Sequence, residues 1–151
     1  VRDAEAWHEI VSDAEVVRYL HWKQRDLTEA TEHLSRRTTH TRLWQTGDFM
    51  ALAVEHDGKL IGDVSVHLRD VEPEHRSAEL GWIMHPGCAG QGFATEAADA
   101  LVEYLRDYVG VKRVLAVMDL ENEASYALAR RLGLAEISRS DDSRTTALDL
   151  V

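Results

Sequence analysis

Apolar residues recur at helical spacing from Trp7 to Leu20, and this pattern predicts one helix at the start of the chain. A second predicted helix runs from Asp26 through Leu34. It begins with Asp26 and Glu29 at the spacing of a capping box, in which each side chain satisfies a backbone N–H of the first turn. The first third of the chain is therefore predicted to hold two helices.

The pattern changes from helical to strand-like at Phe49. Three segments are apolar or alternate apolar and polar residues, as strands do: Phe49–Glu55, Leu60–Leu68 and Ser77–Met84. The pair Asp57-Gly58 lies between the first two segments and suits a tight hairpin turn. Because the links between the three segments are short, we predict an antiparallel meander.

The helical period returns after Pro86. The remaining predicted elements are a long helix from Phe93 to Tyr108 ended by Gly110, a buried strand from Arg113 to Met118, a helix capped by Asn122 and ended by Gly133, and two closing strands, Ala135–Ser138 and Thr145–Val151. This order predicts a single α+β domain over residues 1–151, with a mixed, mostly antiparallel sheet flanked by helices.

The composition limits the partners and the location. The formal net charge is −10, with 17 Lys and Arg residues scattered among 27 acidic ones, so the concentrated basic surface that nucleic acid requires is absent. No apolar run approaches the ~20 residues of a membrane span, and no signal peptide is visible. The single cysteine, Cys88, allows no internal disulfide, and the dispersed histidines have no metal-site spacing. We therefore expect a cytoplasmic protein without nucleic acid, membrane or metal.

A glycine-rich turn between a strand and the long helix is the most informative segment. It reads His85-Pro86-Gly87-Cys88-Ala89-Gly90-Gln91-Gly92-Phe93. Glycines let the backbone approach a ligand, and the free N–H groups and dipole of a helix N-terminus attract phosphate. A P-loop is excluded because no Gly-Lys-Ser/Thr run precedes the helix. A Rossmann fingerprint is excluded because Thr95 stands at the third glycine and the preceding unit is a meander.

Several motifs, in this order, resemble the GNAT superfamily of N-acetyltransferases. The run Ala89-Gly90-Gln91-Gly92-Phe93-Ala94 is similar to the family signature Arg/Gln-x-x-Gly-x-Gly/Ala, which lies between the fourth strand and the third helix. The resemblance is closest to the branch that contains ribosomal-protein N-terminal acetyltransferases. It also rests on Ala78-Glu79-Leu80-Gly81-Trp82, His85-Pro86, Thr95-Glu96-Ala97, Asn122-Glu123-Ala124-Ser125 and Leu132-Gly133-Leu134.

The resemblance implies that acetyl-CoA is the acyl-donor co-substrate. Backbone groups at the end of the third predicted strand would hold the pantetheine arm and the thioester, at Ile83, Met84 and His85. The pyrophosphate would lie on the glycine-rich turn, at Gly90, Gln91, Gly92, Phe93 and Ala94. The side chain of Asn122 would bind the pantetheine arm in addition to capping its own helix.

The resemblance also implies direct transfer of the acetyl group to a primary amine, which needs a base for the amine proton. Glu79 is the candidate, because it lies mid-strand on the face that it shares with Gly81 and Ile83. A salt-bridged or solvated strand residue is the plain alternative for this carboxylate. Asp63 and His67, expected one strand away, are weaker candidates for the acceptor pocket.

The departing thiolate needs an acid. Ser125 lies three residues after Asn122, on the same helical face. Many family members place a tyrosine one turn after the position of Ser125, but Ala129 stands there, so the role would pass to Ser125. Tyr126 points roughly 100° away on a helix and is the second choice. A covalent role for Cys88 is disfavoured, because the family transfers the acetyl group directly.

The acceptor stays open between a protein N-terminus and a small-molecule amine, and a homodimer is a further expectation, because family members often dimerise. Two departures keep an alternative open, a non-catalytic sensor module that binds an acyl-CoA. Ala89 replaces the Arg or Gln that begins the signature, and the family's first strand has no counterpart before Trp7. Arg139–Arg144, which joins the closing strands, is short and polar, so we expect an unusual acceptor side.

Overall fold

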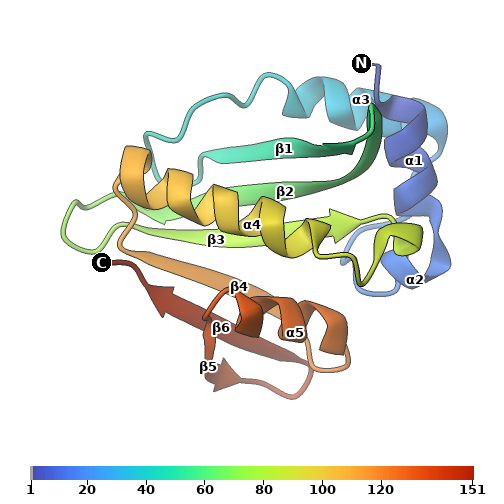
Figure 1. The fold of residues 1–151 in the computed structure, drawn as a ribbon. Helices are drawn as coiled ribbons and strands as arrows, with labels where there is room; N and C mark the ends of the chain where they lie inside the picture. The colour runs from blue at the N-terminus through green and yellow to red at the C-terminus, as the bar shows by residue number, and fades with distance from the viewer. Residues whose placement is uncertain (1) are drawn as a thin grey trace.

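The alternating segments form one six-stranded sheet, with strand order β1-β2-β3-β4-β6-β5 (Figure 1). The structure, a computed structural model, describes residues 2–151. The strands are β1 (Phe49–His56), β2 (Lys59–Asp70), β3 (Ser77–Met84), β4 (Arg113–Asp119), β5 (Ala135–Arg139) and β6 (Ser143–Asp149). Every neighbouring pair is antiparallel except β3 and β4, which are parallel. The predicted α+β class and the meander are confirmed.

Helices cover both faces of this sheet. They are α1 (Ala4–Ser12), α2 (Ala14–Val17), α3 (Leu27–Arg37), α4 (Phe93–Tyr104) and α5 (Glu123–Arg131), with a short 3₁₀ turn at Pro86–Cys88 and a π-helical turn at Leu105–Val109 that continues α4. Among the residues that the structure describes, no strand precedes α1. In Figure 1, α4 runs across the front of the sheet and α5 lies in front of β4 and β6.

The prediction of one helix from Trp7 to Leu20 is wrong. The backbone of Asp13 is extended, with a ψ of 132°, and ends α1. Its side chain then accepts hydrogen bonds from the N–H groups of Glu15 and Val16 and begins α2. An Asp inside an apolar helical pattern can thus cap a new helix rather than continue the old one.

The two faces of β3 belong to two separate cores. Even-numbered side chains such as Leu80 and Trp82 pack with α4 and α5 in the larger core. On the opposite face, Ile83 packs in a smaller core built by Trp7 of α1 and Ala30 of α3. This alternation follows from the pleat of a strand, which sends successive side chains to opposite faces. Each side chain of β3 therefore faces either α4 and α5 or α1 and α3.

A buried carboxylate joins α1 and α3 to the sheet. Asp63 of β2 is 5% exposed and accepts a hydrogen bond of 2.9 Å from Nε1 of Trp7. It also accepts two hydrogen bonds, of 3.3 and 3.1 Å, from the guanidinium of Arg37. Burying an ion pair is costly, but removing one partner of an existing pair costs more, because the other charge is then buried alone. This triad therefore holds the helical layer that faces Ile83.

Replacing Asp63 tests that role. We expect Asp63→Asn to lower the free energy of unfolding by about 3 kcal/mol, because it leaves the guanidinium of Arg37 buried without a counter-charge. The pair of Arg113 and Asp149 has similar two-bond geometry but side chains that are 47% and 72% exposed. Asp149→Asn should therefore destabilise the protein much less than Asp63→Asn does. Equal losses in urea unfolding would contradict the role given to Asp63.

Candidate functional site

Strands β3 and β4 separate soon after they meet. They pair only from Ser77 to Glu79 on β3 and from Arg113 to Leu115 on β4. Beyond Glu79, the rest of β3 is still paired with β2 on its other side, as far as Met84 opposite Gly62. We call the gap between residues 80–84 and residues 116–119 the splay. It leaves one edge of β3 without a strand partner in the middle of the sheet.

The hydrogen bonds to β2 decide which backbone groups of β3 point into the splay. The N–H of His85 donates to the carbonyl of Ile61 at 2.7 Å, so the main chain of His85 faces β2. Because the N–H and C=O of successive strand residues point to opposite edges, Ile83 also faces β2, and Trp82 and Met84 face the splay. The splay thus offers N–H donors and C=O acceptors from two residues in line.

Because of this alternation, the three residues predicted to bind the pantetheine arm do not all face the splay. Ile83, Met84 and His85 were predicted together, but three consecutive residues cannot all face one edge of a strand. The geometry favours Met84 and adds Trp82, which sequence reasoning missed. Main-chain N–H and C=O groups alternate between the two edges of a strand, just as side chains alternate between its two faces. Applying this alternation to the main chain of β3 could have identified Trp82 from the sequence.

The N-terminus of α4 lies just after the splay end of β3 and has no capping side chain. Its N-cap is Gly92, with a φ of 86°, whereas Asp26 caps α3 and Asn122 caps α5 with side-chain oxygens. The N–H groups of Phe93 and Ala94 are therefore free to bind an anion. Gly90 also has a positive φ, of 75°, so the turn depends on its glycines.

The structure thus brings the predicted residues Gly90, Gln91, Gly92, Phe93 and Ala94 together beside the splay. No other group lies within 4 Å of where a Cβ would stand on Gly90 or Gly92, which leaves open space over the turn. The Gln91 side chain donates weakly to the carbonyl of Gly87, at 3.4 Å. The imidazole of His85 accepts a hydrogen bond from the N–H of Gly87 at 2.9 Å and begins the 3₁₀ turn.

Ser125 lies against the α5 side of the splay. Its Oγ accepts a hydrogen bond of 3.1 Å from Nε1 of Trp82, the residue whose main chain faces the splay. An indole N–H can only donate, so the hydroxyl hydrogen of Ser125 stays free to donate elsewhere. The backbone N–H of Ser125 donates to Oδ1 of Asn122 at 3.1 Å, so the amide oxygen of Asn122 is occupied by capping and its NH₂ group is not. Both residues thus keep a donor for a ligand.

Glu79 is the last residue of β3 that pairs with β4, so it lies where the splay begins. Its side chain lies on the face of the sheet opposite that of Trp82. Its Oε2 accepts hydrogen bonds of 2.9 and 2.7 Å from Arg69, and its side chain is 29% exposed. His67 stands directly across from it on β2. Burial, helped by the nearby Arg69, lowers the pKa of His67, so this ring is neutral at neutral pH. The salt bridge that was the plain alternative for Glu79 is present, while Oε1 accepts no hydrogen bond among the described residues.

The weaker candidates lie outside this arrangement. Both carboxylate oxygens of Asp63 are bound by Trp7 and Arg37 in the triad. The ring of Tyr126 lies under the guanidinium of Arg144, 4.0 Å from its centroid. Asp63 therefore serves the packing of α1 and α3 on the sheet, and Tyr126 serves the packing of α5.

The loop between α2 and α3, residues 18–26, reaches across to the end of β4. Arg18 forms an ion pair of 2.9 Å with Glu121, and His21 lies 3.2 Å from Asp119. The hydroxyl of Tyr19 donates to the carbonyl of Glu121 at 3.1 Å. These contacts place the α2–α3 loop over the open end of the splay, beside Asp119, on the face of the sheet that α1 and α3 cover. We call this open end the mouth of the splay.

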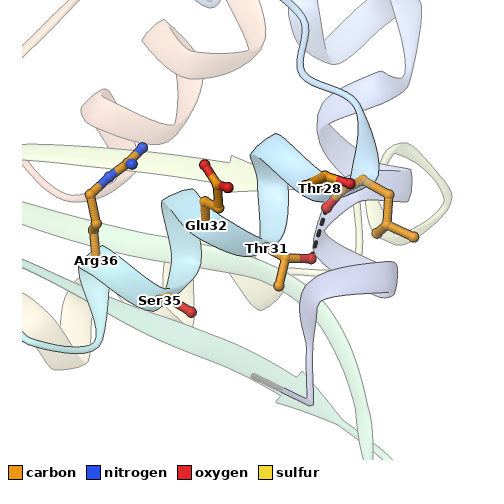
Figure 2. Close-up of a pocket in the computed structure, with 6 residues that line it drawn as sticks. Thr28, Thr31, Glu32, Ser35 and Arg36 are labelled. Atoms are coloured by element: carbon orange, nitrogen blue, oxygen red, sulfur yellow. Dashed lines mark hydrogen bonds between the residues drawn. The ribbon is translucent and has the colours of Figure 1, made fainter.

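A shallow hollow also follows the outer side of α3, as Figure 2 shows. Its lining residues are Leu27, Thr28, Thr31, Glu32, Ser35 and Arg36. None of the predicted site residues lines it. Within residues 2–151, no three side chains of His, Cys, Asp or Glu lie close enough to hold a metal ion, and no helix is long and apolar enough to cross a membrane.

Comparison with known proteins identifies the domain. A family model described as an acetyltransferase (GNAT) domain matches residues 1–135. An uncharacterized N-acetyltransferase of Bacillus subtilis is 32% identical over 134 residues, covering 87% of this chain and 73% of the relative. A spermidine N(1)-acetyltransferase of Escherichia coli is 28% identical over 128 residues, covering 85% of this chain and 65% of the relative.

Solved structures share the fold at low sequence identity. A ribosomal-protein alpha-N-acetyltransferase in complex with coenzyme A has a TM-score of 0.82 and 20% identity, covering 99% of this chain and 89% of that chain. A spermidine N-acetyltransferase from Vibrio cholerae, in complex with CoA and spermine, has a TM-score of 0.77 and 18% identity, covering 98% and 90%. The predicted GNAT-like fold is confirmed.

The two functions assigned to Asn122 can be separated by substitution. Asn122→Ala removes the capping oxygen and should destabilise the protein by about 1 kcal/mol. Asn122→Asp keeps a capping oxygen at the N-terminus of α5 and should stay within about 0.5 kcal/mol of the original stability. Urea unfolding of both variants is the measurement. An equal loss in both would contradict the capping bond to Ser125.

Proposed function

The chain belongs to the GNAT acetyltransferase family, and we propose that it transfers the acetyl group of acetyl-CoA to a primary amine within the splay between β3 and β4. As an acetyl-CoA-dependent N-acetyltransferase it is an enzyme, so the alternative of a non-catalytic acyl-CoA sensor is not favoured. The observation that carries the proposal is the free edge of β3, which leads directly into the uncapped N-terminus of α4.

The residues present fit the co-substrate, which supplies an activated acetyl thioester. The main chain of Trp82 and Met84 would bind the amide groups of the pantetheine arm as an additional strand binds a sheet edge. The N–H groups at the start of α4 and the turn around Gly90 and Gln91 would bind the pyrophosphate. The free NH₂ group of Asn122 would donate to a carbonyl of the arm. Ala89 stands where the family signature has Arg or Gln, so these backbone groups would hold the anion.

Two side chains on opposite faces of the splay would move the protons. Glu79 would accept a proton from the incoming ammonium, so that the amine nitrogen can attack the thioester carbon. Ser125 would donate its free hydroxyl proton to the sulfur as the C–S bond breaks and would take up the second proton that the attacking nitrogen loses, so that an amide, a thiol and a neutral hydroxyl remain. Trp82 would keep that hydroxyl correctly oriented, because its indole N–H occupies one lone pair of Oγ.

The acceptor would enter from the face of α1 and α3, because α4 and α5 fill the other face with the larger core. The similar proteins act on spermidine and on a ribosomal protein N-terminus, as their names state. Both acceptors are primary amines. We therefore propose a primary amine, carried by a small molecule or by a protein N-terminus.

Binding of the co-substrate is the first test. Acetyl-CoA and CoA, at about a hundredfold above their Kd, should raise the melting temperature by about 5 °C or more, because they bind only the folded state. ATP and NAD should produce no comparable shift. The absence of any shift with acetyl-CoA and CoA would overturn the proposed site.

A matched pair of variants tests the helix N-terminus within the same assay. Phe93→Pro removes one N–H at a helix position that tolerates proline, while Phe93→Ala removes the ring and keeps the N–H. The proline variant should bind CoA about tenfold more weakly than the alanine variant. Equal affinities would show that this N–H does not bind the anion.

Ser125 and Trp82 should act as one unit in turnover. Ser125→Ala should lower kcat about 100-fold with little change in the Kd of acetyl-CoA, because it removes the acid and leaves the binding groups. Trp82→Phe should lower kcat about tenfold, because it removes the orienting N–H. In the Ser125→Ala background, Trp82→Phe should have no further effect on kcat. Additive losses would contradict the positioning of Ser125 by Trp82.

A further inference from the structure

Several carboxylates around the splay lie beside basic side chains. Glu79 is bound by Arg69, and Asp63 by Arg37. On the opposite side of the mouth, Arg18 pairs with Glu121, and His21 lies beside Asp119. Arginine side chains thus balance the charges of Glu79, Asp63 and Glu121.

One guanidinium at the same mouth has no counter-charge. Arg25 is the last residue of the α2–α3 loop before the N-cap of α3, and no carboxylate pairs with it within residues 2–151. Its Nη1 atom is buried and has no hydrogen-bond partner. A buried donor without a partner is uncommon and costs free energy, and Nε of Arg37 and Nε of Arg144 are in the same condition. Unlike those two guanidiniums, that of Arg25 forms no ion pair among the described residues.

The Arg25 side chain is held in place by aromatic packing. Its guanidinium lies over the ring of Trp22, 4.9 Å from the centroid. Trp22 packs in turn against Trp7 and His33, at centroid distances of 6.4 and 5.9 Å. A guanidinium stacked in this way is already ordered, so less conformational entropy is lost when it binds an anion.

The local potential around this cluster is positive. Burial, together with the guanidiniums of Arg25, Arg37 and Arg36, lowers the pKa of His33 to about 4. The His33 ring therefore stays neutral at neutral pH. A polyamine would meet repulsion here, and an anionic group would meet attraction.

The cluster lies on the acceptor side of the proposed reaction. Ile83 and Trp22 both pack against the small core of Trp7, Val11 and Ala30, on the face opposite α4 and α5. The α2–α3 loop that carries Trp22 and Arg25 spans from this core to the end of β4. An amine that reaches the splay from this face passes the loop.

We propose that the acceptor is a primary amine that also carries a carboxylate, and that Arg25, stacked on Trp22, binds this carboxylate. This inference rests on the proposed function and names the substrate class of the same site. The carboxylate would form a charge-assisted hydrogen bond with the guanidinium of Arg25, whose side chain is only partly buried. Two sources share this chemistry, a small amino acid and a peptide N-terminus followed by an acidic side chain.

The test compares acceptors that differ only in the carboxylate. In the small-molecule arm, β-alanine and γ-aminobutyrate are compared with their amides and with putrescine. In the peptide arm, short peptides with a free N-terminus and Glu in the second or third position are compared with the same peptides carrying Gln. Acetylated product is measured by mass spectrometry. We expect kcat/KM to be about tenfold or more higher for the carboxylate member in one arm.

Arg25 variants show whether this residue is the cause. Arg25→Gln should remove the preference by lowering kcat/KM for the carboxylate acceptor about tenfold, mainly through KM, with little change for the amide. Arg25→Lys should restore part of the preference, because it keeps the charge but loses the planar stacking. Lys112→Gln is the matched control, since it removes one charge from an exposed residue at the far end of β4 and should leave the preference unchanged.

The outcomes separate this inference from the proposed function. Acetylation of the amides or putrescine as fast as the carboxylate members would overturn the inference and support the enzyme. A carboxylate preference that survives Arg25→Gln would overturn the role of Arg25. No acetylated product from any acceptor in either arm, despite binding of acetyl-CoA, would count against both.

Discussion

The parting of β3 and β4 is the constraint on which the site depends. A strand in the middle of a sheet normally has both edges satisfied, and an unpaired backbone group buried away from water is costly. Here β3 keeps one free edge beyond Glu79, while β2 and the two cores hold the strand rigid on its other sides. The fold thereby offers an extended ligand a ready set of main-chain partners without requiring specific side chains.

Successive side chains of β3 point to opposite faces of the sheet and so separate the residues of the candidate site. Trp82 points toward α5 and meets Ser125, whereas Glu79 and Ile83 point toward the face of α1 and α3. The two residues proposed to transfer protons, Glu79 and Ser125, therefore lie on opposite sides of the same edge. The triad of Asp63, Trp7 and Arg37 matters for the same reason, because it holds the helices that form the wall on the acceptor side.

Much of this could be predicted from the chain. The period changes at Phe49 and Pro86 located the strands and α4, because these features are local in sequence. The anion site expected at the glycine-rich turn stays a prediction. The break at Asp13 was missed because the apolar spacing continues through it. Trp82 was missed because its role comes from main-chain direction, and the bond from Trp82 to Ser125 joins residues 43 positions apart. Nor could composition show that an acidic protein places an unpaired guanidinium, Arg25, beside its acceptor path.

Amide hydrogen exchange at β3, resolved by residue, tests the central claim most directly. The amides of Ile83 and His85 already face β2, so acetyl-CoA should change their exchange little. The amides of Trp82 and Met84 face the splay and should become strongly protected when acetyl-CoA binds. Protection at Ile83 and His85 instead, or no change along β3, would contradict the account that the free edge of this strand holds the co-substrate.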